Sequence, residues 1–172
     1  MRFAVLSILV LILVAAVSPA AAIGFDLGIA AGVQLGGDLS GINIDTDDGF
    51  SLGLELMFEI PIVKLGVGYE YGFPRDTAGS VSDIEYHLVY GVGRVHFFGP
   101  IFAMARVGYA DVSAKVPHLK GSDGTVSWSA GIGFKISKFK IEAMYNDFDI
   151  SIDEIGHSTS YTNYTARLIY SF

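Results

Sequence analysis

Hydrophobic and polar residues alternate along most of the chain after residue 22. In residues 161–172, Tyr164, Leu168 and Phe172 fall on one face, while Asn163 and Arg167 fall on the other. Successive side chains of a β-strand point to opposite faces of a sheet, so this period of two predicts strands. No segment has the continuous apolar run of a strand that is buried on both faces. The chain is therefore predicted to be all-β, with one apolar and one mostly polar face.

The alternation predicts eight antiparallel strands whose connections are alternately long and short. Transmembrane barrels show this asymmetry, because one set of turns is short and periplasmic while the other set faces outside. We therefore expect an eight-stranded up-and-down transmembrane β-barrel, with both termini periplasmic, long extracellular loops, and the last strand paired with the first. The predicted strands are 23–36, 50–60, 65–73, 83–98, 101–110, 125–136, 139–146 and 161–172, and the predicted long loops are 37–48, 74–82, 111–124 and 147–160.

The fourth predicted strand has an irregular pattern. Continuing its alternation would turn Arg94 and His96 towards lipid, where a charge is costly. Either the strand has reached the membrane interface at that point, or a bulge near Gly91 or Gly93 exchanges its faces. In the first part of this strand, the pattern predicts that Ile84, Tyr86, Leu88, Tyr90 and Val92 face outward, and that Asp83, Glu85, His87, Gly91 and Gly93 face inward.

Aromatic residues gather at the two ends of the predicted strands, with Tyr69 and Tyr90 nearer the middle. Amphipathic rings at the two headgroup levels of a bilayer form such girdles. The periplasmic set is Phe25, Phe58, Phe98, Phe134, Phe139, Tyr170 and Phe172, and the outer set is Phe50, Tyr71, Phe73, Tyr86, Tyr109, Trp128, Tyr145 and Tyr164.

Residues 1–22 have the features of a cleavable secretory signal peptide. Arg2 provides the positive charge, residues 4–17 form an apolar segment, and residues 20–22 are a run of alanine suited to cleavage. The apolar segment of about 14 residues is shorter than the ~20 that a spanning helix needs, and Pro19 ends it. We predict one further domain, the barrel, over residues 23–172.

Composition limits the classes of function. The 172 residues are 51% hydrophobic and 17% charged, which suits a single folded domain. The chain has no cysteine, which excludes disulfides, thiolate metal sites and a cysteine nucleophile. Its net charge of −7 argues against binding nucleic acid. A soluble carrier of the lipocalin type is the alternative fold, but that barrel would be polar outside and apolar inside.

Three segments resemble the small bacterial outer-membrane β-barrel family that includes the OmpA transmembrane domain and OmpX. They are GPIFAMARVGYADV (99–112), SWSAGIGFKI (127–136) and the terminal LIYSF (168–172). The resemblance implies an outer-membrane location, a monomeric barrel, and contact with outer-membrane lipids. The closing strand, with Leu168, Tyr170 and Phe172 on one face, resembles the signal by which the outer-membrane assembly machinery recognises its substrates.

The inward face of the predicted barrel carries charges of both signs. Charges enclosed in so narrow a lumen must pair, because each unpaired one would cost several kcal/mol. We expect a salt-bridged plug, and the alternative is a narrow, low-conductance channel lined by the same residues. The predicted lumenal polar network is Glu55, Glu59, Glu70, Glu142, Arg106, Lys135 and Arg167, joined by Asp26, Glu85, Lys64 and Lys140.

The predicted long loops are acidic, and this favours a non-enzymatic role in envelope structure or surface interaction, with a surface ligand as a further partner. Residues 45–48 could hold Ca²⁺ but lack the spacing of an EF-hand, so we predict no metal site and no cofactor. A lipid-modifying enzyme is the less favoured alternative. It would use His157 and Ser158 with Asp153 or Glu154, but those residues fall in a predicted loop rather than on strand ends.

Overall fold

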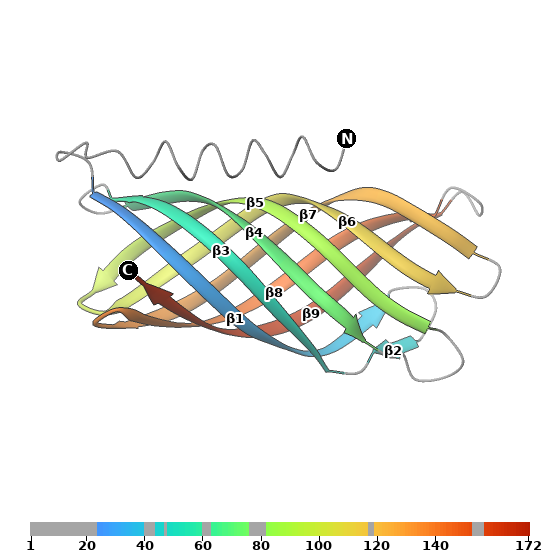
Figure 1. Ribbon diagram of the computed structural model, residues 1–172, viewed down its shortest axis with the longest axis horizontal. Helices are drawn as coiled ribbons and strands as arrows, with labels where there is room; N and C mark the ends of the chain where they lie inside the picture. Colours follow the sequence, from blue (N-terminus) through green and yellow to red (C-terminus); the bar gives the residue numbers. More distant parts are fainter. Residues whose placement is uncertain are drawn as a thin grey trace.

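The computed structural model describes residues 24–39, 44–46, 48–59, 63–75, 82–116, 119–152 and 157–172. Residues 1–22, with the predicted signal peptide, lie outside this part of the chain. The described residues form one antiparallel sheet (Figure 1). Its strands are β1 (Gly24–Leu39), β2 (Ile44–Thr46), β3 (Gly49–Glu59), β4 (Val63–Arg75), β5 (Ser82–Phe98), β6 (Ile101–Val116), β7 (Leu119–Ile136), β8 (Phe139–Ile152) and β9 (His157–Ser171).

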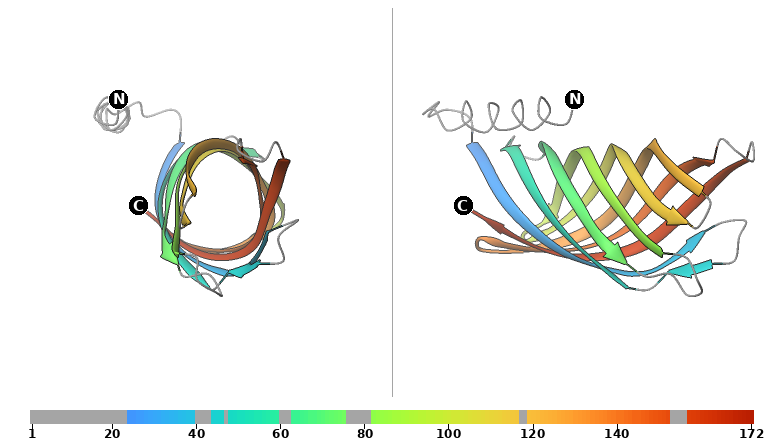
Figure 2. Two further views of the ribbon diagram at one scale, coloured as in Figure 1. Left: turned by 90° about the vertical axis from the view of Figure 1, so that its right-hand side faces the viewer. Right: turned by 45° about the vertical axis from the view of Figure 1, so that its right-hand side comes forward.

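The sheet closes on itself as predicted. The strand β1 pairs with β3 along one edge and with β9 along the other, where its register runs from Gly28 opposite Ser171 to Leu39 opposite Tyr161. The short β2 pairs only with residues 37–39 of β1, so eight strands form the barrel wall (Figure 2). Each of the eight wall strands therefore pairs with a neighbour on both sides. A sheet in hydrocarbon requires this closure, because no water is there to bond its backbone groups.

The two ends of the barrel differ in their connections. At one end, which we call the turn end, tight turns at Gly99–Pro100 and Ser137–Lys138 join neighbouring strands. Gly99 has a φ of 53°, a backbone conformation that glycine adopts without steric cost. At the opposite end, the loop end, the strands continue beyond the predicted limits and project to the right in Figure 1.

Two of the predicted long loops are largely strands. β6 and β7 remain paired from Asp111 opposite Gly124 to Val116 opposite Leu119, and β8 and β9 from Asp147 opposite Thr162 to Ile152 opposite His157. The prediction of loops there was wrong because it relied on apolar residues at every second position. Beyond the bilayer both faces of a strand meet water, so the ladder persists without that pattern.

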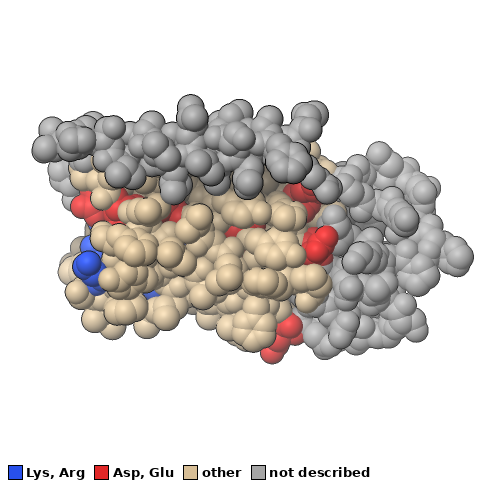
Figure 3. Space-filling model, in the orientation of Figure 1, with Lys and Arg blue, Asp and Glu red and all other residues tan. Residues whose placement is uncertain are grey.

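The outer surface is apolar and the interior is polar. Leu54, Ile132 and Leu168 are 37%, 66% and 48% exposed, whereas Glu55 and Arg167 are buried. This polarity contradicts the lipocalin alternative and fits a barrel whose wall meets hydrocarbon. On the face shown in Figure 3, the middle of the molecule is mostly free of charged residues. Among the described residues, no helix is long and apolar enough to cross a membrane.

The facing of β5 was predicted wrongly. Arg94 is 1% exposed and lies inside the barrel, and the register with β4 is unbroken from Val63 opposite Val95 to Gly72 opposite Tyr86. Neither a bulge near Gly91 or Gly93 nor an interfacial Arg94 therefore explains the pattern; the two faces of the strand are exchanged along its length. Tyr86, Leu88, Tyr90 and Val92 are buried inside, His87 is exposed on the outer face, and Glu85 is half-buried there.

Glycines on β4 explain why β5 takes this facing. A Cβ atom on Gly68 would lie 2.4 Å from Cζ of Tyr90, and one on Gly72 would lie 2.1 Å from Cε1 of Tyr86. The two tyrosine rings therefore occupy space that any larger residue on β4 would fill. Tyr86 and Tyr90 belong to the interior, so Tyr86 is not part of the outer aromatic girdle.

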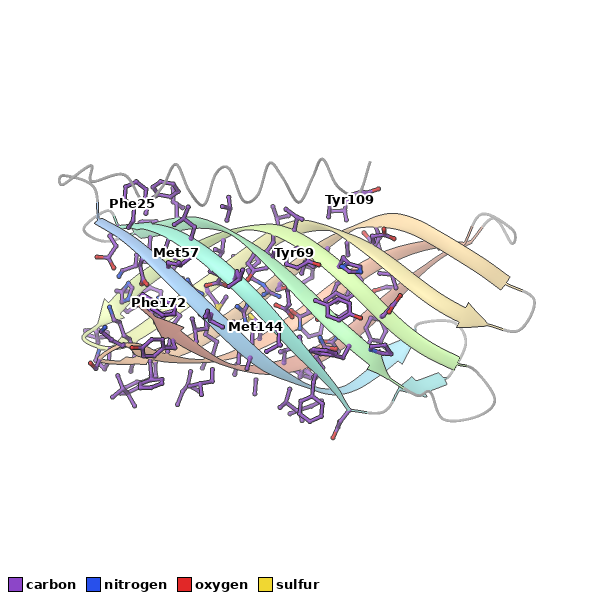
Figure 4. The ribbon with its side chains drawn as sticks, in the orientation of Figure 1. Phe25, Met57, Tyr69, Tyr109, Met144 and Phe172 are labelled. Atoms are coloured by element: carbon purple, nitrogen blue, oxygen red, sulfur yellow. The ribbon has the colours of Figure 1, made fainter. Side chains whose placement is uncertain are left out.

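The other aromatic residues of the two predicted girdles lie on the outer surface. Phe25 and Phe172 lie towards the turn end and Tyr109 towards the loop end (Figure 4). Neighbouring rings pack together: the centroids of Phe139 and Tyr170 are 5.2 Å apart, and those of Trp128 and Tyr145 are 5.6 Å apart. Such belts hold a barrel at a fixed height in the bilayer.

Candidate functional site: the charged barrel interior

Six buried charges occupy the middle of the barrel. Three are arginines, three are glutamates, and each is at most 4% exposed. Equal numbers of opposite charges make the group neutral overall, which limits the cost of removing them from water. The six, which we call the charge cluster, are Glu55 (β3), Glu70 (β4), Arg94 (β5), Arg106 (β6), Glu142 (β8) and Arg167 (β9).

Four members of the charge cluster form a closed ring of alternating sign. Glu55 accepts a 2.6 Å hydrogen bond from Nη2 of Arg94 and one of 2.8 Å from Nη2 of Arg167. Glu142 accepts a 2.8 Å bond from Nε of Arg94, and its other oxygen lies 3.9 Å from Nη1 of Arg167. Because β5 and β9 stand on opposite sides of the barrel, the ring crosses its full width.

The third arginine extends the ring towards the loop end. Nη1 of Arg106 donates a 2.9 Å bond to Glu70, and the same oxygen of Glu70 lies 3.4 Å from Nη1 of Arg167. The guanidinium of Arg106 also lies over the ring of Tyr90, 4.4 Å from its centroid. All six charges are thus linked through shared partners, so removing one exposes several others.

Tyrosine hydroxyls donate further hydrogen bonds to the carboxylates of the charge cluster. Tyr90 donates a 2.8 Å hydrogen bond to Oε1 of Glu55, and Tyr86 donates one of 2.8 Å to Oε1 of Glu70. Gln34 donates in turn to the Tyr86 hydroxyl. Buried carboxylates need such donors, because each oxygen without a partner is costly in a dry interior.

Amide and apolar side chains fill the rest of the interior. Asn146 accepts a 3.2 Å bond from Arg106 and donates 2.7 and 2.8 Å bonds to Asn163 and Thr165. Beyond them towards the loop end, the rings of Phe148 and Tyr161 pack 5.8 Å apart. Met57, Phe102, Met104 and Met144 are also buried inside the barrel. This filling is characteristic of an eight-stranded barrel, which is only wide enough to hold side chains.

The structure places five of the seven residues of the predicted lumenal network in the charge cluster: Glu55, Glu70, Glu142, Arg106 and Arg167. The other two lie apart from it. Glu59 pairs with Lys64, and its side chain is 41% exposed. Lys135 is half-buried, one position before the end of β7. Lys140 and Asp26 form a separate pair, 2.6 Å apart.

The prediction missed Arg94, Tyr86 and Tyr90 as members of the interior. The sequence contained the information needed to place them. Arg94 interrupts an otherwise apolar face, and a charged side chain belongs inside the barrel. Counting back in steps of two from an inward Arg94 would have placed Tyr90 and Tyr86 inside as well.

The described residues bring together no group of three metal-ligating side chains. His87, predicted to face the lumen, lies on the outer surface with its Nδ1 2.6 Å from the hydroxyl of Tyr69. Glu85, also predicted inside, lies on the same outer face.

The candidate enzymatic and calcium-binding side chains fall outside the described part of the chain. They are His157, Ser158, Asp153 and Glu154 for the enzyme, and Asp45 and Asp47 for calcium. Asp48 accepts a 3.0 Å bond from the backbone of Gly36.

Solved structures with the same fold include small outer-membrane barrels. The neisserial surface protein NspA is 15% identical, with a TM-score of 0.59 over 86% of this chain and 97% of that one. Ail of Yersinia pestis, in complex with the heparin analogue sucrose octasulfate, is 14% identical, with a TM-score of 0.61 over 86% and 99%. The outer-membrane enzyme PagL is 17% identical, with a TM-score of 0.57 over 83% and 98%.

Sequence comparison assigns the family. A comparison with curated proteins gives no match. The family model described as "Outer membrane protein beta-barrel domain" matches residues 7–172, which includes every described strand. Together with the closed sheet and its apolar outer wall, this match establishes that the chain belongs to the outer membrane protein beta-barrel domain family and is a barrel of the bacterial outer membrane.

Proposed function

We propose that this protein is a plugged, non-enzymatic barrel that serves in envelope structure or surface interaction through the acidic segments at its loop end. The observation that carries the proposal is the ring of Arg94, Glu55, Arg167 and Glu142, which joins opposite walls of the barrel. An ion crossing the lumen would have to separate buried pairs, at a cost of several kcal/mol for each charge left unpaired. The interior therefore supports the wall rather than conducting.

We also propose an orientation of the barrel in the membrane and a set of partners. The tight turns face the periplasm, with both chain termini, and the loop end faces outside. Leu168, Tyr170 and Phe172 share the outer face of the closing strand and serve as the signal read by the assembly machinery. Ail was solved with an anionic heparin analogue, whereas the acidic loops of this chain would repel one. We expect a monomer whose surface ligand is basic.

Planar-bilayer recording on the purified protein tests the plug. The wild type is expected to show no steady conductance. Glu55→Gln leaves Arg94 and Arg167 without one shared carboxylate, so brief openings should appear in that variant. Glu59→Gln, at the exposed pair with Lys64, is the matched control and should stay closed. If the wild type conducts steadily and Glu55→Gln changes that conductance, the lumen is a narrow channel and not a plug.

A lipid-A mass spectrum tests the absence of enzymatic activity. PagL is an outer-membrane enzyme with the same fold, so the fold alone leaves both outcomes open. Overexpression of this chain should leave the lipid-A spectrum unchanged. A new lipid-A species that disappears in His157→Ala would contradict the proposal.

A further inference from the structure

The mouth of the barrel at the turn end holds a lysine that has no carboxylate partner among the described residues. Lys135 faces inward from β7, one position before the strand ends, and its side chain is half-buried. Every other inward-facing lysine or arginine whose side chain the structure describes forms an ion pair. Lys64 pairs with Glu59, Lys140 with Asp26, and Arg94, Arg106 and Arg167 with glutamates of the charge cluster.

Lys135 also stands directly opposite a second cation. The register of β7 and β8 places it across from Lys140, on the same inward face. Like charges that lie directly opposite each other destabilise a sheet. The charge of Lys140 is offset by Asp26, whose carboxylate lies 2.6 Å from its Nζ, and that carboxylate is thereby engaged. Lys135 has no such compensation from a described side chain, and local costs of this kind are expected at functional sites.

An aromatic ring forms the floor of this mouth. Phe102 is fully buried and lies in register with His96 of β5, and the centroids of their rings are 5.4 Å apart. The guanidinium of Arg94 lies 5.7 Å from the centroid of Phe102, so this ring contacts the charge cluster as well as the mouth. His96 is half-buried, and its imidazole brings a ring nitrogen that can donate a hydrogen bond.

The charges around His96 are mainly positive. Lys64, Lys135 and Arg94 all lie near enough to act on its ring, and the carboxylate that opposes them is Glu59. Glu59 is already bound to Lys64, so it leaves Lys135 uncompensated.

The ionised side chains of the mouth therefore sum to one positive charge. Its two ion pairs are neutral, the charge cluster beside it is neutral, and Lys135 is left over. The connection over residues 60–62 reads Ile-Pro-Ile in the sequence and adds no charged side chain. A small anion from the surrounding water would balance this charge.

We propose that the turn-end mouth binds the phosphate group of a small water-soluble molecule, through Nζ of Lys135 and a ring N–H of His96. A phosphate supplies the missing negative charge, and its several oxygens accept hydrogen bonds from both donors. Both side chains point inward, whereas the phosphate of a membrane lipid lies on the outer side of the wall. The site goes beyond the proposed function and lies apart from the ring of the charge cluster, so it stands whether or not the lumen conducts.

An NMR titration of the isotope-labelled protein in neutral detergent micelles tests the site. Inorganic phosphate replaces sodium chloride at constant ionic strength, and the amide shifts of His96 and Lys135 are followed. A saturable shift is expected at both amides, with half-saturation at about 1–10 mM from one charge-assisted and one neutral hydrogen bond. Shifts that rise linearly without saturation would overturn the proposal.

Two lysine variants show whether the response depends on position. Lys135→Gln removes the charge-assisted hydrogen bond and should weaken phosphate binding, read at His96, by about tenfold or more. Lys138→Gln is the matched control, because Nζ of Lys138 lies 5.8 Å from the ring centroid of Tyr170, which faces outward. It should leave the half-saturation unchanged. Heat-modifiable gel mobility confirms that both variants are folded. Equal weakening in the two variants, or none in Lys135→Gln, overturns the site.

Phosphatidylglycerol added to the micelles distinguishes a lipid phosphate from a soluble one. We expect the lipid to shift the amide of Lys138, on the outer side of the wall, and to leave those of His96 and Lys135 in place. A response of Lys135 to the lipid with none to inorganic phosphate would contradict the proposal.

Discussion

The ion pairs in the middle of the barrel and the pair at its turn end use the same chemistry in opposite surroundings. Arg94 and Glu55 are both 1% exposed at the side chain, and each has a second charged partner. Lys64 and Glu59 lie at the edge of the wall, where their side chains are 13% and 41% exposed. Water and salt screen the second pair, whereas the first pair has only protein around it. Burial and shared partners therefore decide how much an ion pair contributes to stability.

Removing Arg167 should give the largest loss of stability. Arg167→Met takes a partner from Glu55, Glu70 and Glu142 together, so the barrel should lose about 3–5 kcal/mol of unfolding free energy. Urea unfolding in lipid vesicles, followed by Trp128 fluorescence, measures the loss. Adding Glu142→Gln restores charge balance and should recover part of it. A single variant within about 1 kcal/mol of wild type would show that the six charges are not coupled.

Two glycine substitutions sharpen the contrast between the interior and the outer wall. Gly68→Ala drives a methyl group into Tyr90, which its bond to Glu55 holds in place, and should cost about 1–3 kcal/mol. Gly91→Ala places its Cβ in ordinary contact, 3.9 Å from the backbone oxygen of Val107, so it should cost nothing and add up to about 0.5 kcal/mol by restricting the unfolded chain. The same unfolding experiment compares them. Equal losses at the two positions would contradict the assignment of Gly91 to the outer face.

The exposed pair should give the smallest effect. Lys64→Met is expected to change the unfolding free energy by less than about 0.5 kcal/mol, and the change should shrink further in high salt. Unfolding curves at low and high sodium chloride concentrations measure both quantities. A loss comparable to that of Arg167→Met would remove the distinction between the two regions.

The fold could be predicted from sequence because the bilayer imposes a strict pattern. Along β9 every second residue meets lipid, so Leu168 and Arg167 fall unambiguously on opposite faces. The pairing of β9 with β1 follows because a sheet in hydrocarbon must close.

The alternating pattern of β5 does not show which of its faces lies inside the barrel. Tyr86 and Tyr90 carry apolar rings like those of lipid-facing residues, but they fill the space left by Gly72 and Gly68 on β4. Side-chain polarity shows which face of a strand lies inside the barrel only when the interior residues are polar. The facing of this strand depends on its partner strand, and a single-strand pattern carries no such information.

The members of the charge cluster could be predicted better than their partners. Charges on an alternating strand are assigned to the interior because hydrocarbon excludes them, and this identified Glu55 and Arg167. Which carboxylate meets which guanidinium depends on the stagger of the strands around the barrel. The bond between them joins residues 112 positions apart in the sequence, and no local pattern encodes it.

A pair of double-mutant cycles tests the central claim most directly. One cycle combines Arg94→Met with Glu55→Gln, and the other combines Lys64→Met with Glu59→Gln, with unfolding free energies measured in the same lipid vesicles. We predict a coupling of about 2 kcal/mol or more for the interior pair and below about 0.5 kcal/mol for the exposed pair. Similar small couplings for both pairs would contradict a barrel whose interior is held together by its buried charges.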